Sequence, residues 1–334
     1  MAARLEVAPA VPAPDLIDLR RLSSANLDPL LQEETREWQT ALDWDFGKSS
    51  DLVRRFLDLR ALSGCALVTA GETVGYSYFV VEEQKGLIGD LYVRPAWRTV
   101  ENESRLLNSV LEGVVTGSQA RRVESQLMML LPGVPRTLPG SGFLTTYERT
   151  FMLLDLDAVA IPGDRPARCR IHTETWSDHH QESAAQLIAA AYTGHIDSHI
   201  NDQYRSLPGA RRFLYNIVQY PGCGTFLRSA SYVAFDLDHG HLAGLSLASI
   251  VGPESGHITQ ICVAPQVRGT GVGYELLRHS LITLKEHGCR RVSLTVTAAN
   301  REAVDLYKQI GFRTLRKFSA YVWEGFGGAR HPHI

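Results

Sequence analysis

A glycine-rich loop between a predicted strand and a predicted helix has the clearest chemistry in this sequence. The loop spans Gln266 to Gly273 and reads QVRGTGVG. Glycines let the backbone turn tightly and present consecutive N–H groups to an anion. The helix predicted from Val272 adds the positive end of its dipole. The pattern predicts a cradle for a pyrophosphate; a tight turn without a ligand is the alternative.

Two more segments stand in fixed order around this loop. Residues 258–265 read ITQICVAP, an apolar alternation that ends in proline, and residues 300–312 read NREAVDLYKQIGF. Together with the loop they resemble the GNAT superfamily of N-acetyltransferases. That family has the loop pattern Gln/Arg-x-x-Gly-x-Gly/Ala and the later pattern N-x-x-A-x-x-L-Y-x-x-x-G-F. The resemblance covers the whole second half of the chain and extends more weakly over the first.

This resemblance implies that acetyl-CoA is the co-substrate. The loop N–H groups would hold its pyrophosphate, and the strand at 261–263 would pair with the pantetheine arm and polarise the thioester carbonyl. Asn300 would contact the pantetheine or the loop, or cap the helix that follows it. The residues expected at the cofactor are Ile261, Cys262, Val263, Gln266, Val267, Arg268, Gly269, Thr270, Gly271, Val272, Gly273, Asn300 and Tyr307.

The same resemblance makes Tyr307 the expected general acid. A neutral phenol can protonate a departing thiolate; a packed tyrosine that only orders the cofactor is the alternative. Family members often carry an acidic base on the fourth strand, where this chain has Thr259 and Gln260. We expect His257 and Glu254 just before that strand and take them as candidate bases, since histidine titrates near neutrality. A surface turn is the alternative for His257.

The polar segment 192–205 is expected to wall the acceptor pocket. Asp197 or Asp202 could pair there with a cationic amine, or lie in a solvated loop. His195 and His199 are four residues apart, which on a helix places them on one face. A metal there would need further ligands that the sequence does not indicate, so we predict no metal.

Recurring landmarks indicate a duplicated domain. Pro95 and Pro265 are 170 residues apart, and the Gly-Phe pairs at 142–143 and 311–312 are 169 apart. Around them the periodicity predicts similar elements in both halves. The expected helices are 25–44, 52–62, 105–115, 179–192, 209–220, 272–286 and 301–309, and the expected strands are 65–69, 74–81, 86–95, 122–130, 231–236, 241–251, 258–265 and 291–297.

The fold class follows from this plan and the resemblance. We expect two tandem α/β (α+β) GNAT folds, each a mixed, mostly antiparallel sheet flanked by helices. The tandem arrangement resembles that of mycothiol synthase and related tandem acetyltransferases. The expected boundaries are a disordered arm (1–15), a degenerate GNAT domain (16–160), a linker (161–167) and a catalytic GNAT domain (168–334).

The first half departs from the family pattern at its own loop. Thr99 and Glu101 replace the two key glycines, and residues 131–135 break the helix pattern that should precede Gly142. We therefore expect this half to keep the fold, to lack a cofactor site, and to complete the acceptor cleft or stabilise the second domain. Trp38, Trp44 and Phe46 are expected in its core.

The composition indicates which partners and which cellular compartment to expect. Hydrophobic residues make up 44% and the net charge is −2, which gives no bulk charge for nucleic acid or a membrane surface. Five cysteines without a C-x-x-C pattern favour reduced thiols. No signal peptide or membrane-spanning run is recognised. We expect a cytoplasmic monomer or homodimer.

The expected function is transfer of an acetyl group to a primary amine by direct attack in a ternary complex. The acceptor would be a small-molecule or peptide amine. Cys262 is expected to pack rather than act as a nucleophile. Three alternatives remain: an acyl-CoA-binding module without turnover, a transferase that uses another acyl donor, and an enzyme that acts on a protein amine.

Overall fold

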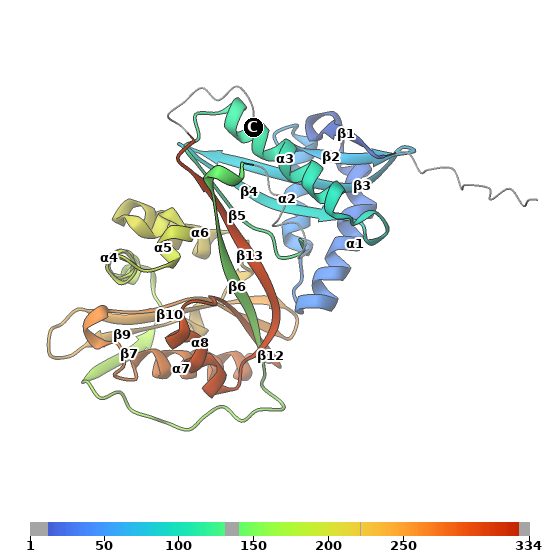
Figure 1. Ribbon diagram of the computed structural model, residues 1–334. Helices are drawn as coiled ribbons and strands as arrows, with labels where there is room; N and C mark the ends of the chain where they lie inside the picture. The colour runs from blue at the N-terminus through green and yellow to red at the C-terminus, as the bar shows by residue number, and fades with distance from the viewer. Residues whose placement is uncertain (1–12, 131–139, 221, 327–334) are drawn as a thin grey trace, which may run out of the picture.

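The computed structural model describes residues 13–130, 140–220 and 222–326 (Figure 1). Its strands form one continuous sheet in the order β1-β2-β3-β4-β5-β13-β6-β12-β11-β10-β9-β7, with β8 paired to β10. Helices of the first half pack against the strands of that half, and helices of the second half pack against theirs (Figure 1). Among the helices of the described residues, none is both long enough and apolar enough to cross a membrane.

Within the described residues, the first half contributes three α-helices and six strands. The helices are α1 (Ser24–Leu42), α2 (Gly47–Asp58) and α3 (Val100–Gly117). The strands are β1 (Asp15–Asp18), β2 (Ser63–Thr69), β3 (Glu72–Glu82), β4 (Lys85–Val93), β5 (Arg122–Gln126) and β6 (Leu144–Asp155).

The second half repeats this plan. Its helices are α4 (Gln181–Ala191), α5 (Asp197–Ile200), α6 (Leu207–Gln219), α7 (Val272–Glu286) and α8 (Arg301–Ile310). Its strands are β7 (Ile171–Thr175), β8 (Thr225–Phe226), β9 (Tyr232–Asp236), β10 (Leu242–Gly252), β11 (Ser255–Val263), β12 (Arg291–Thr297) and β13 (Arg313–Glu324). The mixed, mostly antiparallel sheets flanked by helices agree with the expected fold class.

The two halves exchange their last strands. β6 ends the first half but pairs with β12 of the second, and β13 ends the second half but pairs with β5 of the first. β6 and β13 also pair antiparallel with each other, and Figure 1 shows these two long strands crossing from one half to the other. The sheet of each half is therefore completed by a strand from the other half.

In both halves the fourth strand separates from the neighbouring parallel strand at an equivalent position. In β11 the pairing with β10 skips Thr259, and in β4 the pairing with β3 skips Gly89, so each fourth strand carries a β-bulge. The parallel pairing of β11 with β12 ends at Ile258, and that of β4 with β5 ends at Ile88. Beyond these points the neighbouring strands diverge and leave one edge of β11 open.

Several predicted boundaries are corrected. α1 ends at Leu42 rather than residue 44, because Asp43 takes the left-handed conformation (φ 55°). α3 begins at Val100 because Thr99 accepts a hydrogen bond from the amide of Asn102 as its N-cap. The strand expected over 122–130 ends at Gln126. Residues 1–12 of the expected disordered arm lie outside the described residues, whereas Asp15 pairs in β1. The segment 131–135, expected to break a helix, also lies outside them.

Candidate functional site

The glycine-rich loop leads directly into α7. Gly269 (φ 72°) and Gly271 (φ 104°) both lie in the left-handed region, which other residues rarely adopt. Gly271 is the N-cap of α7, and the first-turn amides that follow it have no carbonyl within the helix to bond. The amides of Val267 and Thr270 instead donate to Ala264 O and Val267 O within the loop. These two loop amides are therefore not available to a ligand, whereas the first-turn amides of α7 are.

A groove of about 1020 Å³ runs from this loop to α8. It follows the open edge of β11 and passes the start of α7. Eleven of the thirteen residues expected at the cofactor line it: Ile261, Cys262, Val263, Val267, Arg268, Gly269, Gly271, Val272, Gly273, Asn300 and Tyr307. Gln266 is exposed outside the lining, and the Thr270 hydroxyl donates to Val267 O within the loop.

A second, more enclosed cavity of about 460 Å³ adjoins the groove. The two spaces share lining residues from β11, from α8 and its N-cap, and from the turn after α4. The residues common to both are Tyr192, Ile261, Asn300, Ala303 and Tyr307. A ligand lying in the groove and a ligand in the cavity would therefore meet beside the Tyr307 side chain.

Tyr307 lies on α8 and is 6% exposed. Burial, and after it the nearby Asp197 charge, raise the pKa of this phenol above its ordinary value, while Arg149 acts in the opposite direction. The hydroxyl therefore keeps its proton at neutral pH. Asn300 caps α8 by accepting from the Ala303 amide (3.4 Å), and its amide nitrogen lies 3.3 Å from His195 Nε2.

The first half supplies an aromatic wall of the cavity. Trp38 and Phe46 stack with ring centroids 4.7 Å apart, and Trp44 meets His257 edge-on at 4.9 Å. These three aromatic residues are buried, as expected, and they also line the cavity. Asp43 fixes their position, since it accepts a hydrogen bond from Ser255 and forms an ion pair with Arg291 at 2.9 Å.

His257 and Glu254 lie in different surroundings. His257 does not precede the strand: it is the third residue of β11, 6% exposed, with Nδ1 2.9 Å from Ser293 Oγ. Burial lowers its pKa to about 3, so the ring is neutral at neutral pH. Glu254 is exposed in the turn before β11, 3.8 Å from Arg290, and lines neither space. Geometry thus brings His257 to the cavity and leaves Glu254 away from it.

The two expected acceptor aspartates also separate. Asp197 lines the cavity, where it accepts from the Thr297 hydroxyl and pairs with Arg149 at 3.3 Å. Asp202 forms an ion pair with Lys85 and lines a different pocket at the seam between the halves. Only Asp197 can therefore reach a ligand beside Tyr307.

Sequence reasoning missed the environment of Gln260. Its amide nitrogen donates to the Tyr192 hydroxyl (2.7 Å), and the Tyr204 hydroxyl donates to its carbonyl (3.2 Å). The two rings stack with centroids 4.3 Å apart. Asp90, 170 residues earlier on β4, holds the equivalent place after the bulge and is buried. The duplication could have revealed this pairing of positions, but not the tyrosine contacts.

Cys262 lines the groove but is not a reactive thiol. It is 8% exposed, and burial raises its pKa to about 12, so the thiolate form is scarce at neutral pH. A covalent acyl intermediate on this residue is therefore disfavoured, in agreement with the packing role expected for it.

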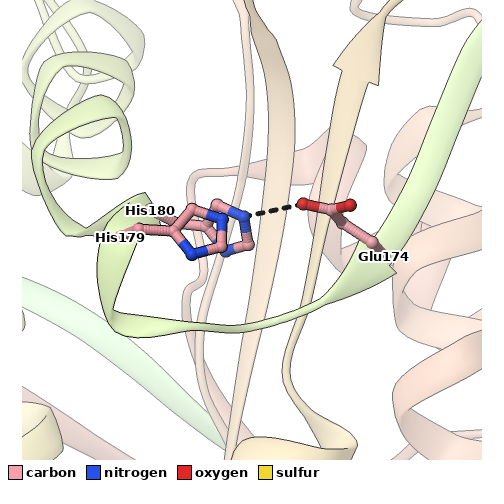
Figure 2. A group of neighbouring side chains, drawn as sticks. All are labelled: Glu174, His179 and His180. Atoms are coloured by element: carbon pink, nitrogen blue, oxygen red, sulfur yellow. Dashed lines mark hydrogen bonds and ion pairs between the residues drawn. The ribbon is translucent and has the colours of Figure 1, made fainter.

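A group of side chains at the start of the second half has metal-ligand composition. Figure 2 shows Glu174, His179 and His180 close together, with a bond between His180 Nε2 and Glu174 Oε1 at 2.7 Å. The other ring nitrogen of His180 accepts the Ser177 amide (3.0 Å), so Nε2 carries the proton. A metal at Nε2 would force that proton onto Nδ1, against the Ser177 amide. The group therefore fits a structural turn better than a metal centre. His195 and His199 do not belong to this group.

Comparisons with known proteins concern the family and the fold of this chain. The model of the acetyltransferase (GNAT) family matches residues 173–312. A mycothiol acetyltransferase of Corynebacterium jeikeium is 33% identical over 70 residues, which are 21% of this chain and 20% of that protein. An N-alpha-acetyltransferase of Sulfurisphaera tokodaii is 34% identical over 73 residues, 22% of this chain and 44% of that protein. The chain spans about half or less of the curated relatives it matches.

Solved structures extend the likeness to the whole chain. A GCN5-related N-acetyltransferase from Sphaerobacter thermophilus has a TM-score of 0.68 at 17% identity and covers 94% of this chain and 97% of its own. A tandem GNAT protein from the clavulanic acid biosynthesis pathway has a TM-score of 0.61 at 16% identity, with 95% and 99% covered. At these identities the likeness concerns the fold. The chain therefore carries a GNAT acetyltransferase domain over residues 173–312, within a tandem GNAT fold.

Proposed function

We propose that the second half of this protein transfers an acetyl group from acetyl-CoA to a primary amine held in the aromatic cavity. The observation that supports this most is the meeting of the groove and the cavity at Tyr307. The groove has the loop and strand edge suited to a nucleotide thioester. The cavity has room for a small amine, and its wall comes from both halves. The proposed domains are residues 16–160 and 168–334 with a linker at 161–167, except that β1 extends the first domain to Asp15.

The start of α7 would hold the donor. The first-turn amides after Gly271 point at the groove with the positive end of the helix dipole, which suits a pyrophosphate. The open edge of β11 would bind the amides of the pantetheine arm, because β12 no longer pairs there beyond Ile258. Arg268 lines the same groove, and its guanidinium donates to Ala191 O (2.6 Å).

The reaction would then be direct attack. The neutral amine nitrogen bonds to the thioester carbonyl carbon, an amide of β11 near Ile261 stabilises the developing oxyanion, and the C–S bond breaks. Tyr307 would give its proton to the leaving sulfur, and the proton lost by nitrogen would restore the phenol through water. The raised pKa of Tyr307 suits a proton donor. The high pKa of the Cys262 thiol supports transfer without an acyl-enzyme.

Before this attack, the acceptor ammonium would release its proton to solvent water rather than to His257 or Glu254. We assign Asp197 to drawing the ammonium into the cavity, since its carboxylate lies near Tyr307. His257 is neutral and lines the same cavity. It would form a hydrogen bond with the substrate amine rather than act as the main base. The role suggested for Glu254 stays a prediction, to which the geometry adds no support.

Thiol release from acetyl-CoA in the presence of a panel of primary amines tests this proposal. We expect release that depends on the amine, together with a product heavier than that amine by one acetyl group. Heat of acetyl-CoA binding without release for any amine would instead favour a binding module. Faster turnover with a longer acyl-CoA in a direct competition would identify another donor.

A further inference from the structure

Arg149 has a buried donor that no group of the described residues satisfies. It lies on β6, opposite Thr297 of β12 and Phe318 of β13. Its Nη1 donates to Thr297 Oγ1 (2.8 Å) and Asp197 Oδ1 (3.3 Å), whereas its buried Nε has no hydrogen-bond partner. An unpaired buried donor costs about 1–3 kcal/mol. Such a group at the wall of a cavity points to a missing acceptor atom.

The cavity around Arg149 holds few charges. Among its described lining residues, Arg149 and Asp197 are the charged pair, and His257 is neutral. Both charges act on the Tyr307 phenol, Asp197 raising and Arg149 lowering its pKa, so both lie near the place of reaction. The remaining wall includes six large apolar side chains: Trp38, Trp44, Phe46, Met128, Phe213 and Phe318.

We propose that the acceptor is an α-amino acid with a large apolar side chain, an inference that rests on the proposed acetyl transfer. Its carboxylate would bind the Nε–Nη2 edge of Arg149, whose parallel N–H groups match the two oxygens of a carboxylate. Its amine would lie toward Asp197 and Tyr307. Its apolar side chain would pack against the aromatic wall that the first half contributes.

This arrangement explains why the cavity contains both signs of charge. An amine without a carboxylate would need Asp197 but would leave Arg149 Nε unpaired. An α-amino acid carries both complementary groups on one carbon, and Arg149 and Asp197 are themselves 3.3 Å apart. The products would be the N-acetylamino acid and the coenzyme A thiol: a C–N bond replaces the C–S bond, and Tyr307 protonates the sulfur.

Matched acceptor pairs test the proposal in the full-length protein. Phenylalanine, tryptophan and leucine are compared with 2-phenylethylamine, tryptamine and isoamylamine, which lack only the carboxylate, and with phenylalaninamide and a phenylalanyl peptide amide. We expect kcat/KM to be about tenfold or more higher for each amino acid than for its decarboxylated partner, since a site built for a group rejects analogues without it. Equal or higher values for the simple amines or the peptide would overturn the proposal and leave acetyl transfer standing.

A variant comparison separates recognition from folding. Arg149→Met should reduce the amino acid to amine ratio of kcat/KM to near one, because only the amino acid loses a partner. Arg98→Met is the matched control, since it removes another ion-paired, mostly buried arginine, which lies against Glu37 in the first half. It should leave the ratio unchanged. A ratio unaltered by Arg149→Met means that water alone satisfies Nε and contradicts the proposal. Should Arg149→Met fail to fold, the wild-type ratios still decide. If no amine in the panel consumes acetyl-CoA, acetyl transfer itself fails and this inference fails with it.

Discussion

Arg149 and Phe318 are cross-strand partners, and both line the enclosed cavity although each belongs to the last strand of a different half. Arg149 lies on β6, which completes the sheet of the second half, and Phe318 lies on β13, which completes that of the first. The cavity is therefore built at the exchange itself. Neither half can form it alone.

The exchange predicts that the halves stay together without a covalent link. A protease site inserted in the irregular linker at 161–167 should allow clean cleavage, and the two fragments should then co-elute and unfold in one transition. Size-exclusion chromatography followed by thermal unfolding measures this. Two separate folded monomers after cleavage would contradict strand exchange as the basis of the fold.

Replacing Tyr307 by Phe should slow the chemical step. The variant keeps the ring and loses the proton donor, so kcat should fall by about 100-fold while the affinity for coenzyme A changes little. Steady-state kinetics combined with calorimetric titration measure the two effects separately. Turnover equal to that of wild type would remove Tyr307 as the acid. A loss of cofactor affinity as large as the loss of kcat would instead assign it to cofactor binding.

The aromatic wall predicts an effect on the acceptor alone. Trp44→Leu should raise KM for the acceptor by about tenfold, about 1.4 kcal/mol, and leave KM for acetyl-CoA unchanged, since Trp44 lines the cavity and not the groove. Trp97→Leu serves as control, because Trp97 packs on the core of the first half away from the cavity. Similar changes in both KM values, or in both variants, would show that the wall acts only through stability.

His257 predicts a specific dependence of stability on pH. Burial lowers its pKa to about 3, below the ordinary value near 6.5, so below pH 6.5 the unfolded chain binds a proton that the folded chain does not. Through this residue, lowering the pH from 7 to 5 should therefore reduce the free energy of unfolding by about 2 kcal/mol. His257→Gln should lose that dependence when compared by urea unfolding at both pH values. His287→Gln, an exposed residue at the end of α7, should retain it. Equal slopes in wild type and His257→Gln would refute the assignment.

Most helices and strands of the second half could be predicted from local sequence patterns. The bounds of α7 and β12 agree with their apolar periods, and the glycines at 269 and 271 do adopt the left-handed conformation that the loop requires. The strand exchange was not predictable in this way. β6 and β13 hold equivalent positions in the two halves, and their pairing depends on contacts between residues 160 to 179 positions apart, which local propensity does not encode.

The cavity proposed for the acceptor was the least predictable part for the same reason. Trp44 and Phe46 are residue types typical of a protein core. They follow the left-handed turn at Asp43, and their side chains line the cavity together with residues of the second half. His257 was expected before the strand because the bulge at Thr259 alters the apparent alternation of β11. Arg149, with its unpaired Nε, carries no local signal at all in the sequence.

Titration of coenzyme A into three proteins by calorimetry tests the account most directly. Gly271→Glu places a carboxylate at the N-cap of α7, at a backbone conformation suited to glycine. Gly288→Glu makes the same change at the other end of α7, also at positive φ (94°) and in open space. We predict that wild type and Gly288→Glu bind with similar Kd, while Gly271→Glu binds at least about 100-fold more weakly. Gly271→Glu that folds and binds coenzyme A as tightly as wild type would contradict the central claim that the amides at the start of α7 hold the cofactor.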